Sequence, residues 1–596
     1  MGARARGASA RGGRSSPERR TRAPAGPGAG RAARALPRIS VLLGAGLLLA
    51  GCANPLFPDG ADYAPALAPE RLRRIERAPL DRFKVETPAP EAVLDAAVAK
   101  TRFDGVERME MSVEEARASA LRHNLDLQVS LLNPAIAAEG LAQEEGRFES
   151  VFTLAALWAE TDTPISSELE SAQQRFHQIE PGVRIPLRTG GTTEIRLPIS
   201  RNETDNPFST LNPAYTSDLE FSISHPLMRG AGRRATTYPI RIASYELQIS
   251  LAQTKGEVVR QLAASDRAYW RLYAARAVLD VRLQQLELAQ AQLDRAQRRF
   301  EAGDVAEIEV LRAQAGVAQR LDEIISAQTA VLQQQRELKL VINAPGLGVD
   351  SSTQVVTSSP PDPVRYEFDR DELLAAAVEN RMEMLELELR LAADLATADW
   401  TRNQALPLLA LDYTYRVNGL GGSFSRSMTT LQDNNFEDWS VGLRGEIPLG
   451  NEEREAAVRR ALVQRLQRLG TRDAREQAIE REVLDAIDAI ESAWQRVIAT
   501  RQSVILNTRA FRAEERQFGV GESTSTDVLI AAANLGEAQL SEISAVVDYQ
   551  VAQVDLAFAT GTLLGADRVE IMPPDPQGTL GRTTGDTGAP APAGGG

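Results

Sequence analysis

The 596-residue sequence contains one cysteine, three histidines and few aromatic residues, which make up 5% of the chain. A single cysteine excludes an intrachain disulfide and any metal site built from several cysteines. His123, His177 and His225 lie in unrelated sequence, and no metalloprotease, nucleophile-elbow or dinucleotide-binding motif accompanies them. We therefore predict that the chain is not an enzyme and that it carries no cofactor and no metal.

Long apolar runs are also scarce, and the run at residues 39–50 is too short to cross a bilayer as a helix. It follows an arginine-rich leader and ends in small residues before Cys52, which is the form of a signal peptide. This segment resembles a bacterial lipoprotein signal, which would make Cys52 the acylated first residue of the mature chain, carrying palmitate. An ordinary signal peptide with an incidental cysteine is the alternative.

Charge is distributed unevenly along the chain. Residues 1–51 contain ten arginines and one glutamate, so removing this +9 segment from a total of −14 leaves about −23 for the rest. A body this acidic repels phosphates, and we predict no binding to nucleic acid.

An internal duplication organises the sequence. Residues 300–311 and 518–529 align at a constant shift, which pairs Phe300 with Phe518, Gly303 with Gly521 and Glu309 with Asp527. Each copy is predicted to be a sharp reversal between two helices, in which the glycine adopts a left-handed conformation and an Asp or Ser/Thr cluster caps the next helix. Repeated units of this kind determine the fold.

The two copies share a helical plan. Each opens with a capping signal, Ser112 with Glu115 and Asp369 with Glu372, followed by a predicted helix of about 35 residues, roughly 50 Å long. Very long helices are predicted at residues 238–302 and 452–520, at about 100 Å each, and shorter returning helices at 307–342 and 526–564. The natural arrangement stacks the short helices end to end beside each long one.

The difference in length between the two copies indicates that the long helices pack along their length as coiled coils. The copies differ by seven residues between an internal arginine (Arg276 or Arg501) and the tip phenylalanine. One heptad is the insertion that keeps a packing seam on the same side. The aromatic residues of this region are therefore predicted to anchor the seam rather than to bind ligands: Tyr269, Trp270 and Trp494.

Between the helices the hydropathy period changes to two, which predicts strands. Opening strands are predicted at 151–160 and 408–417, and returning strands at 217–225 and 438–447, with polar loops at 161–170 and 418–435. Further strand-like sequence at 175–187 and 192–200 could add a hairpin to the first copy only. The aromatic residues of these strands fit a membrane girdle or ordinary hairpin packing: Trp158, Tyr413, Tyr415 and Trp439.

These assignments divide the chain into six parts. They are a signal peptide (1–51), a lipid-anchored arm (52–111), a first repeat (112–342), a linker at the middle of the body (343–368), a second repeat (369–565) and a disordered tail (566–596). Four short strands cannot close a barrel, and a membrane tolerates strands only in closed barrels. We therefore predict a mainly α protein whose tandem helix, β-hairpin, helix repeats assemble from several copies into a membrane β-barrel above a long α-helical barrel.

The sequence resembles the TolC-like outer-membrane efflux family, in its lipoprotein branch, over roughly residues 112–565. The resemblance rests on the tandem plan, on the paired tip motifs and on the strand exits Pro226-Leu227 and Pro448-Leu449. It implies a homotrimer with a twelve-stranded barrel in the outer membrane and a helical tunnel in the periplasm. It also implies docking to a periplasmic adaptor and to an inner-membrane pump of the RND or ABC type, for passive conduction of exported substrates.

The resemblance also implies two sites at the helical tips. The residues in the adaptor-docking positions are Gly303, Asp304, Val305, Gly521, Glu522 and Ser523. Asp527, and Glu309 at the equivalent position, would form an acidic ring at the periplasmic entrance. Ile530 departs from the family, which has a second acid there. Asp527 is equally well explained as a helix N-terminal carboxylate that favours the helix dipole.

Two further alternatives stay open at this point. A lipid-anchored coiled-coil spacer without a channel would have similar helices but no need for the strand pairs. Drug efflux and protein secretion share the same sequence plan.

Overall fold

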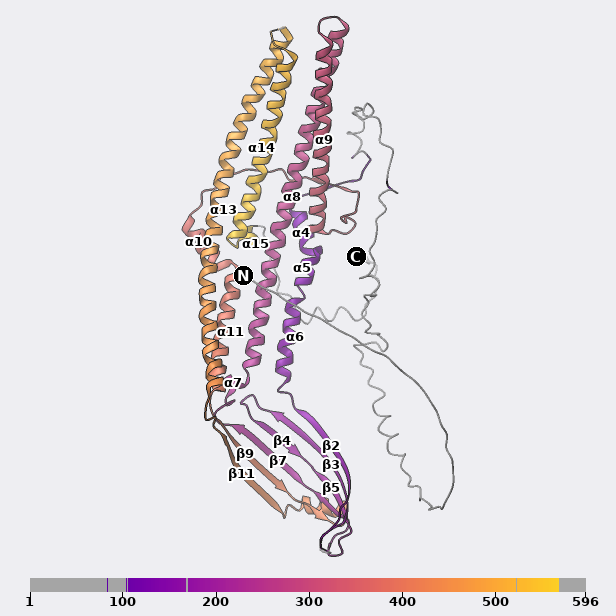
Figure 1. Ribbon diagram of the computed structural model, residues 1–596, viewed down its shortest axis with the longest axis vertical. Coiled ribbons are helices and arrows are strands. Elements are labelled where there is room, and N and C mark those ends of the chain that lie inside the picture. The colour runs from indigo at the N-terminus through magenta and orange to yellow at the C-terminus, as the bar shows by residue number, and fades with distance from the viewer. Residues whose placement is uncertain (1–82, 84–102, 104, 168–169, 521, 567–596) are drawn as a thin grey trace, which may run out of the picture. The chain divides into compact units, whose positions relative to one another are not determined.

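The computed structural model describes residues 83, 103, 105–167, 170–520 and 522–566 (Figure 1). Apart from residue 83, these belong to one compact unit that begins at Pro88, and this unit is described below. The predicted leader, Cys52, most of the arm, Gly521 and nearly all of the tail lie outside the described residues.

The duplication predicted from the sequence is visible in the order of the helices. In the first repeat they are α4 (Val113–His123), α5 (Leu125–Ser130), α6 (Asn133–Gly146), α7 (Arg233–Thr236), α8 (Tyr238–Glu301) and α9 (Glu307–Ile342). In the second repeat they are α10 (Arg370–Asn380), α11 (Met382–Gln404), α12 (Phe424–Gln432), α13 (Glu452–Val520), α14 (Ser525–Ala559) and α15 (Leu563–Ala566). Among the described residues, none of these helices contains a stretch long and apolar enough to span a membrane.

The prediction of one unbroken opening helix is wrong in both repeats. The first breaks at Asn124 and again at residues 131–132, and the second breaks at Arg381. Asn124 and Arg381 are equivalent positions, and their backbones are extended. The Asn124 side chain accepts the Leu127 N–H at 2.8 Å and donates to the Val341 carbonyl at 2.9 Å. These contacts cap a new helix and fasten the break to α9, so tertiary contacts override the helical pattern.

The long helices α8 and α13 match their predicted bounds closely. They contain 64 and 69 residues, which correspond to about 96 and about 104 Å. In each repeat the short helices lie along the long one as predicted: α4 to α6 and α9 along α8, and α10, α11 and α14 along α13 (Figure 1).

Aromatic residues anchor the helix seam, as predicted. Tyr269 on α8 is fully buried, donates its hydroxyl proton to the Met111 carbonyl at 3.1 Å and accepts the Ser359 N–H at 2.9 Å. In the second repeat Trp494 on α13 packs against Tyr549 on α14, with ring centroids 5.4 Å apart. A buried aromatic body whose polar tip is hydrogen-bonded fixes both the depth and the register of a helix pair.

The linker at residues 343–368 contributes one strand. β8 (Gln354–Thr357) pairs in parallel with β1 (Arg108–Met111), so the end of the predicted arm is hydrogen-bonded to the middle of the helical unit. Arg276 on α8 donates to the Val355 carbonyl at 2.7 Å and ties this small sheet to the long helix.

A second, nine-stranded sheet continues from one end of the helices (Figure 1). Its strands are β2 (Val151–Asp162), β3 (Gln173–Pro186), β4 (Thr192–Arg196), β5 (Ile199–Thr204), β6 (Ala214–Ser217), β7 (Leu219–Pro226), β9 (Leu408–Val417), β10 (Leu420–Gly421) and β11 (Glu437–Glu446). The simple hairpin predicted for the second repeat is confirmed, since β9 pairs with β11 over its full length.

The extra hairpin that the sequence suggested for the first repeat is confirmed, since β3 pairs with β4, and this repeat contributes two further strands that were not predicted. The segments at 175–187 and 192–200 form β3 and β4, and β5 and β6 follow them. As a result β2 pairs with β3 and not with β7, while β7 pairs with β4 on one side and β9 on the other. The predicted loop at 418–435 also differs, because it contains β10 and the helix α12.

Candidate functional site: a two-faced sheet and two helical tips

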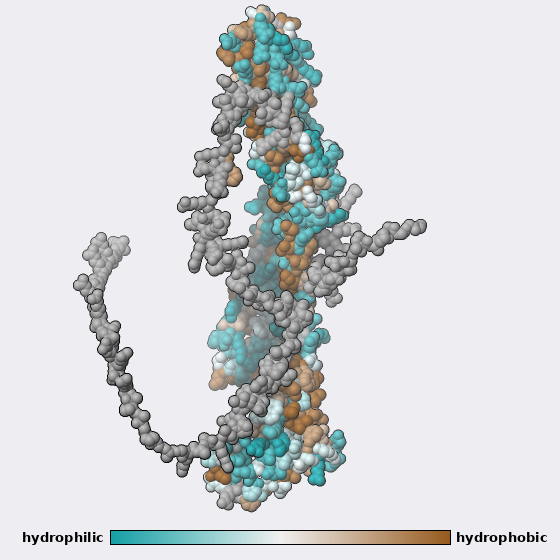
Figure 2. All heavy atoms as spheres, turned by 90° about the vertical axis from the view of Figure 1, so that its right-hand side faces the viewer, coloured by the Kyte–Doolittle hydropathy of each residue, from teal (hydrophilic) through white to brown (hydrophobic). Residues whose placement is uncertain are grey.

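One face of the large sheet is apolar across its whole width. Strand pairing places six residues side by side on this face, one from each of six strands: Phe152, Val183, Ile195, Phe221, Tyr415 and Trp439. Phe152 and Trp439, at the two edges, are 66% and 69% exposed. Figure 2, which views the molecule from the β2 side, shows hydrophobic side chains gathered on the part of the sheet next to the helices.

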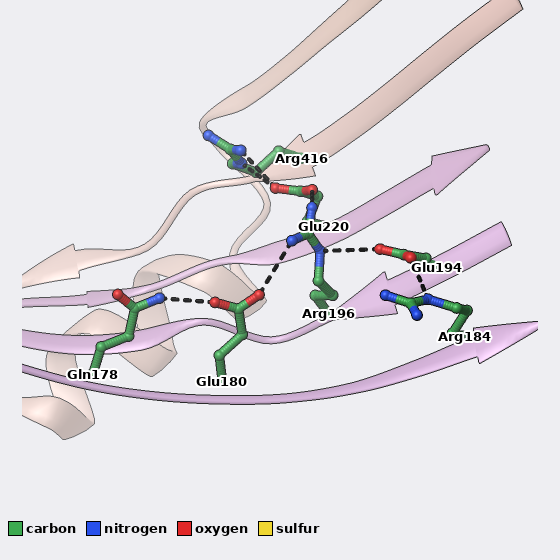
Figure 3. Close-up of polar contacts among 7 residues, drawn as sticks. All are labelled: Gln178, Glu180, Arg184, Glu194, Arg196, Glu220 and Arg416. Carbon is green, nitrogen blue, oxygen red and sulfur yellow. Dashed lines mark hydrogen bonds and ion pairs between the residues drawn. The ribbon is translucent and has the colours of Figure 1, made fainter. Parts of the chain in front are cut away.

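The opposite face carries a charged network that was not predicted from the sequence (Figure 3). Glu220 on β7 lies directly between Arg196 on β4 and Arg416 on β9, and both guanidinium groups bind its carboxylate. The Arg416 Nη2 atom is 2.5 Å from Glu220 Oε2. Opposite charges facing each other across strands stabilise a sheet.

The network extends into the strands that only the first repeat possesses. Arg196 Nη1 also lies 3.3 Å from Glu180 on β3, and Arg184 on β3 donates to Glu194 on β4 at 2.6 Å. Three arginines thus face three glutamates, so the local charge is balanced. A signal for this network was present in the sequence, because Glu194 and Arg196 alternate with Thr193 and Ile195 along a single strand.

This difference between the faces limits what the sheet can do. Large apolar side chains that lie exposed on one face are stable only against an apolar medium or a partner. A face of paired Arg, Glu and Gln side chains is suited to water. A sheet with these two faces can separate lipid from an aqueous passage, in the alternating pattern of membrane strands.

The first helical tip, between α8 and α9, has the predicted glycine conformation. Gly303 has φ +80°, its N–H bonds the Phe300 carbonyl at 2.9 Å, and Asp304 N–H bonds the Arg299 carbonyl at 2.8 Å. The predicted side-chain cap is wrong here, since Ala306 precedes α9 and has no side-chain oxygen. Phe300, at the end of α8, is 44% exposed.

The second tip, between α13 and α14, has the predicted cap. Thr524 and Asp527 form a reciprocal capping box, in which the Asp527 carboxylate accepts from the Thr524 hydroxyl at 2.6 Å and from its N–H at 3.1 Å. These hydrogen bonds, the one from the hydroxyl first, lower the pKa of the exposed Asp527 carboxyl. The interpretation of Asp527 as a helix N-terminal carboxylate is therefore confirmed.

The two tips meet at a shared groove of about 260 Å³. The Arg299 guanidinium of the first tip lies 5.5 Å from the centre of the Phe518 ring of the second, a cation–π contact. Of the predicted site residues, Val305, Glu309 and Ser523 line this groove.

The other tip residues described here, Gly303, Asp304, Glu522 and Asp527, do not line the groove. Two of the groove residues have partners of their own. Glu309 pairs with Arg312 at 2.7 Å, and Ser523 donates to Glu514 at 2.8 Å.

Known outer membrane proteins are similar to this chain in sequence. A family model described as "Outer membrane efflux protein" matches residues 194–344 and 373–562. The outer membrane protein TolC of Salmonella enteritidis is 25% identical over 308 residues, which cover 50% of this chain and 60% of that protein. TolC of Escherichia coli is 25% identical over 305 residues, with the same coverage. The alignment thus spans somewhat over half the length of these relatives.

Solved structures resemble the fold. The CmeC outer membrane channel of Campylobacter jejuni matches with a TM-score of 0.57 at 14% identity, over 79% of this chain and 88% of that one. The outer membrane protein VceC of Vibrio cholerae matches with a TM-score of 0.54 at 15% identity, over 75% and 96%.

Proposed function

Because the chain belongs to the outer membrane efflux protein family, we propose that it forms the outer-membrane channel of an export system and passively conducts substrates to the exterior. The observation that carries this proposal is the two-faced sheet, whose apolar face suits lipid and whose charged face suits a water-filled passage. A coiled-coil spacer has no use for such a sheet, which disfavours that alternative.

The channel is proposed to be a homotrimer. One chain exposes apolar side chains along α13 that no other described residue covers, among them Val463, Leu466, Ile498 and Leu506, which are 50% to 66% exposed. Burying them between copies would line up long helices into a tunnel about 100 Å long. The same association would satisfy the open edges of the sheet.

The remaining parts of the proposal concern anchoring and partners. Cys52 is proposed to carry the lipid anchor in the outer membrane, with the helices extending into the periplasm. The tip residues Gly303 to Val305 and Gly521 to Ser523 are proposed to dock a periplasmic adaptor, which connects the channel to an RND or ABC pump. Asp527 and Glu309 are proposed to give the periplasmic entrance its negative potential.

Planar-bilayer recording tests the channel. The purified oligomer should give discrete conductance steps that prefer cations, and Asp527→Asn should lower that preference without abolishing the steps. A well-folded oligomer that stays silent would favour the spacer.

Acyl labelling tests the anchor. Cells that express the full chain should incorporate labelled palmitate, and Cys52→Ser should abolish incorporation because the chain has no other cysteine. Undiminished labelling in the variant would refute lipidation at Cys52.

A further inference from the structure

The nine strands of the large sheet form only six continuous rows. β4 and β5 pair with β3 in one register, and the interruption between them contains Pro198, which has no N–H to donate. In the same way, β7 pairs with β4 and β6 pairs with β5 in one register, so β6 and β7 form one row. β9 pairs with β7 and β10 pairs with β6 in one register, so β9 and β10 form another row. The Leu197 N–H bonds the Pro181 carbonyl at 2.9 Å and the Asp218 N–H bonds the Pro198 carbonyl at 3.0 Å, so the ladder runs through the interruption.

The six rows in order are β2, β3, β4 with β5, β6 with β7, β9 with β10, and β11. Every row contains at least ten residues, and the two edge strands contain 12 and 10. A membrane strand needs about 9–11 residues. All six rows are therefore long enough to belong to a membrane wall.

The two edges of this sheet are open and complementary. Within the described part of the chain, β2 pairs only with β3, and β11 pairs only with β9. Because successive rows are antiparallel and their number is even, β2 and β11 run in opposite directions. Both carry large apolar residues on the same face, with Phe152, Leu154 and Trp158 on β2 and Trp439, Val441 and Leu443 on β11.

We propose that β11 of one copy pairs with β2 of the next, so that three copies close an 18-stranded wall. This rests on the proposed homotrimer and differs from the twelve strands that the family resemblance implies. The six extra strands are β3 and the β4–β5 row of each copy, which lie between the opening and returning strands of the first repeat and have no equivalent in the second.

The added rows widen the passage through the barrel, and their charged side chains line it. With strands about 4.8 Å apart and tilted by about 40°, 18 strands give a backbone diameter of about 36 Å, against about 24 Å for twelve. The cross-section is then roughly twice as large. Four members of the charged network belong to the added rows: Glu180, Arg184, Glu194 and Arg196. The enlarged wall therefore suits bulkier cargo than a twelve-stranded one.

Disulfide trapping tests the pairing of the edges. Ala156→Cys on β2 is combined in turn with Trp439→Cys, Val441→Cys and Leu443→Cys on β11. These three positions lie on one face two residues apart, so one of them should come within disulfide distance of Ala156 in the neighbouring copy. Mild oxidation of the membrane-embedded protein should then give covalent dimers and trimers for that pair.

The matched control is Ala156→Cys with Ser440→Cys, whose side chains lie on opposite faces, and it should cross-link at least tenfold less. Single-cysteine variants correct for any contribution of Cys52. Cross-linking confined to one chain would overturn the proposal, and so would its absence in a verified trimer. A protein that proves to be a stable monomer would instead refute the proposed homotrimer.

The strand count is the second readout. An electron cryo-microscopy map of the full chain in lipid nanodiscs should show 18 strands around the wall. Twelve strands, with β3 to β5 folded outside the wall, would overturn the proposal and leave the channel function standing.

Discussion

Glu220 offers the most direct test of the charged face, because its carboxylate binds two arginines at once. The Glu220 side chain is 9% exposed, while Arg196 and Arg416 are each 40% exposed. Breaking a fully buried ion pair costs about 3–5 kcal/mol, since it leaves a desolvated charge without a partner. Here water reaches both arginines and reduces that figure, so Glu220→Gln should lower the free energy of unfolding by about 1–3 kcal/mol.

The measurement is urea unfolding of the detergent-solubilised protein, followed by tryptophan fluorescence. Glu160→Gln is the matched control, because Glu160 pairs with Arg175 at 3.1 Å but both side chains are at least 60% exposed. It should cost less than about 1 kcal/mol. Removing Arg416 together with Glu220 should cost less than the two single changes combined, since it also removes the uncompensated charge. Equal effects of Glu220→Gln and Glu160→Gln would refute a structural role for the network.

Two further changes probe the helical part. Arg117 binds the fully buried Asp266 through two hydrogen bonds of 2.8 and 2.9 Å, so Arg117→Met should cost about 3–5 kcal/mol in thermal or urea unfolding. Burial raises the pKa of Asp266 above its usual 3.8, so the folded state binds the proton more tightly than the unfolded state. The stability that protonated Asp266 contributes is therefore present below pH 3.8 and is lost as pH rises through the raised folded pKa. The cost of Arg117→Met, measured against the unchanged protein at the same pH, should accordingly be smaller in acid than at neutral pH, and a cost that grows as the pH falls would contradict this. At the first tip, Gly303→Ala should destabilise by about 1 kcal/mol, because φ is +80° although a Cβ would meet nothing within 4 Å. Gly316→Ala, in open space within α9, should stabilise by about 0.5–1 kcal/mol, and equal effects at the two glycines would argue against conformational strain at the tip.

The helices and the second-repeat hairpin could be predicted because their signals are local. These signals are the period of the hydrophobic residues, 3.6 for a helix and 2 for a strand, a glycine at a reversal, and a capping box such as that of Thr524 and Asp527. Each of them depends on residues that are close together in the sequence. The breaks at Asn124 and Arg381 could not be predicted, since each depends on side-chain contacts with distant segments. The polar strands β5 and β6 escaped prediction for a related reason, because they lack the apolar alternation that marks a strand.

The charged network shows most clearly what periodicity cannot reveal. Glu220 is 196 residues from Arg416 in the sequence, and only the strand order brings them together. To predict that Glu220 binds two arginines, one must know the register of β4, β7 and β9. A shift of one residue in β4 or β9 would move Arg196 or Arg416 to the apolar face of the sheet.

Geometry limits how the sheet and the long helices of this fold can be extended: strands can be added only in pairs, and helices can be lengthened only by heptads. In the first repeat α6 leads into β2 and α8 follows β7, so both ends of the strand segment must return to the helices. Each added row reverses the chain direction, and only an even number of rows satisfies this requirement. The long helices can change length only by seven residues at a time. On α8, Leu272, Leu279 and Leu286 are spaced seven residues apart and are all buried, with exposures of 0%, 8% and 0%. A heptad inserted in such a helix keeps the same side chains in the packing seam. The sheet can therefore gain hairpins and the helices can gain heptads, and neither addition changes the packing of the other part.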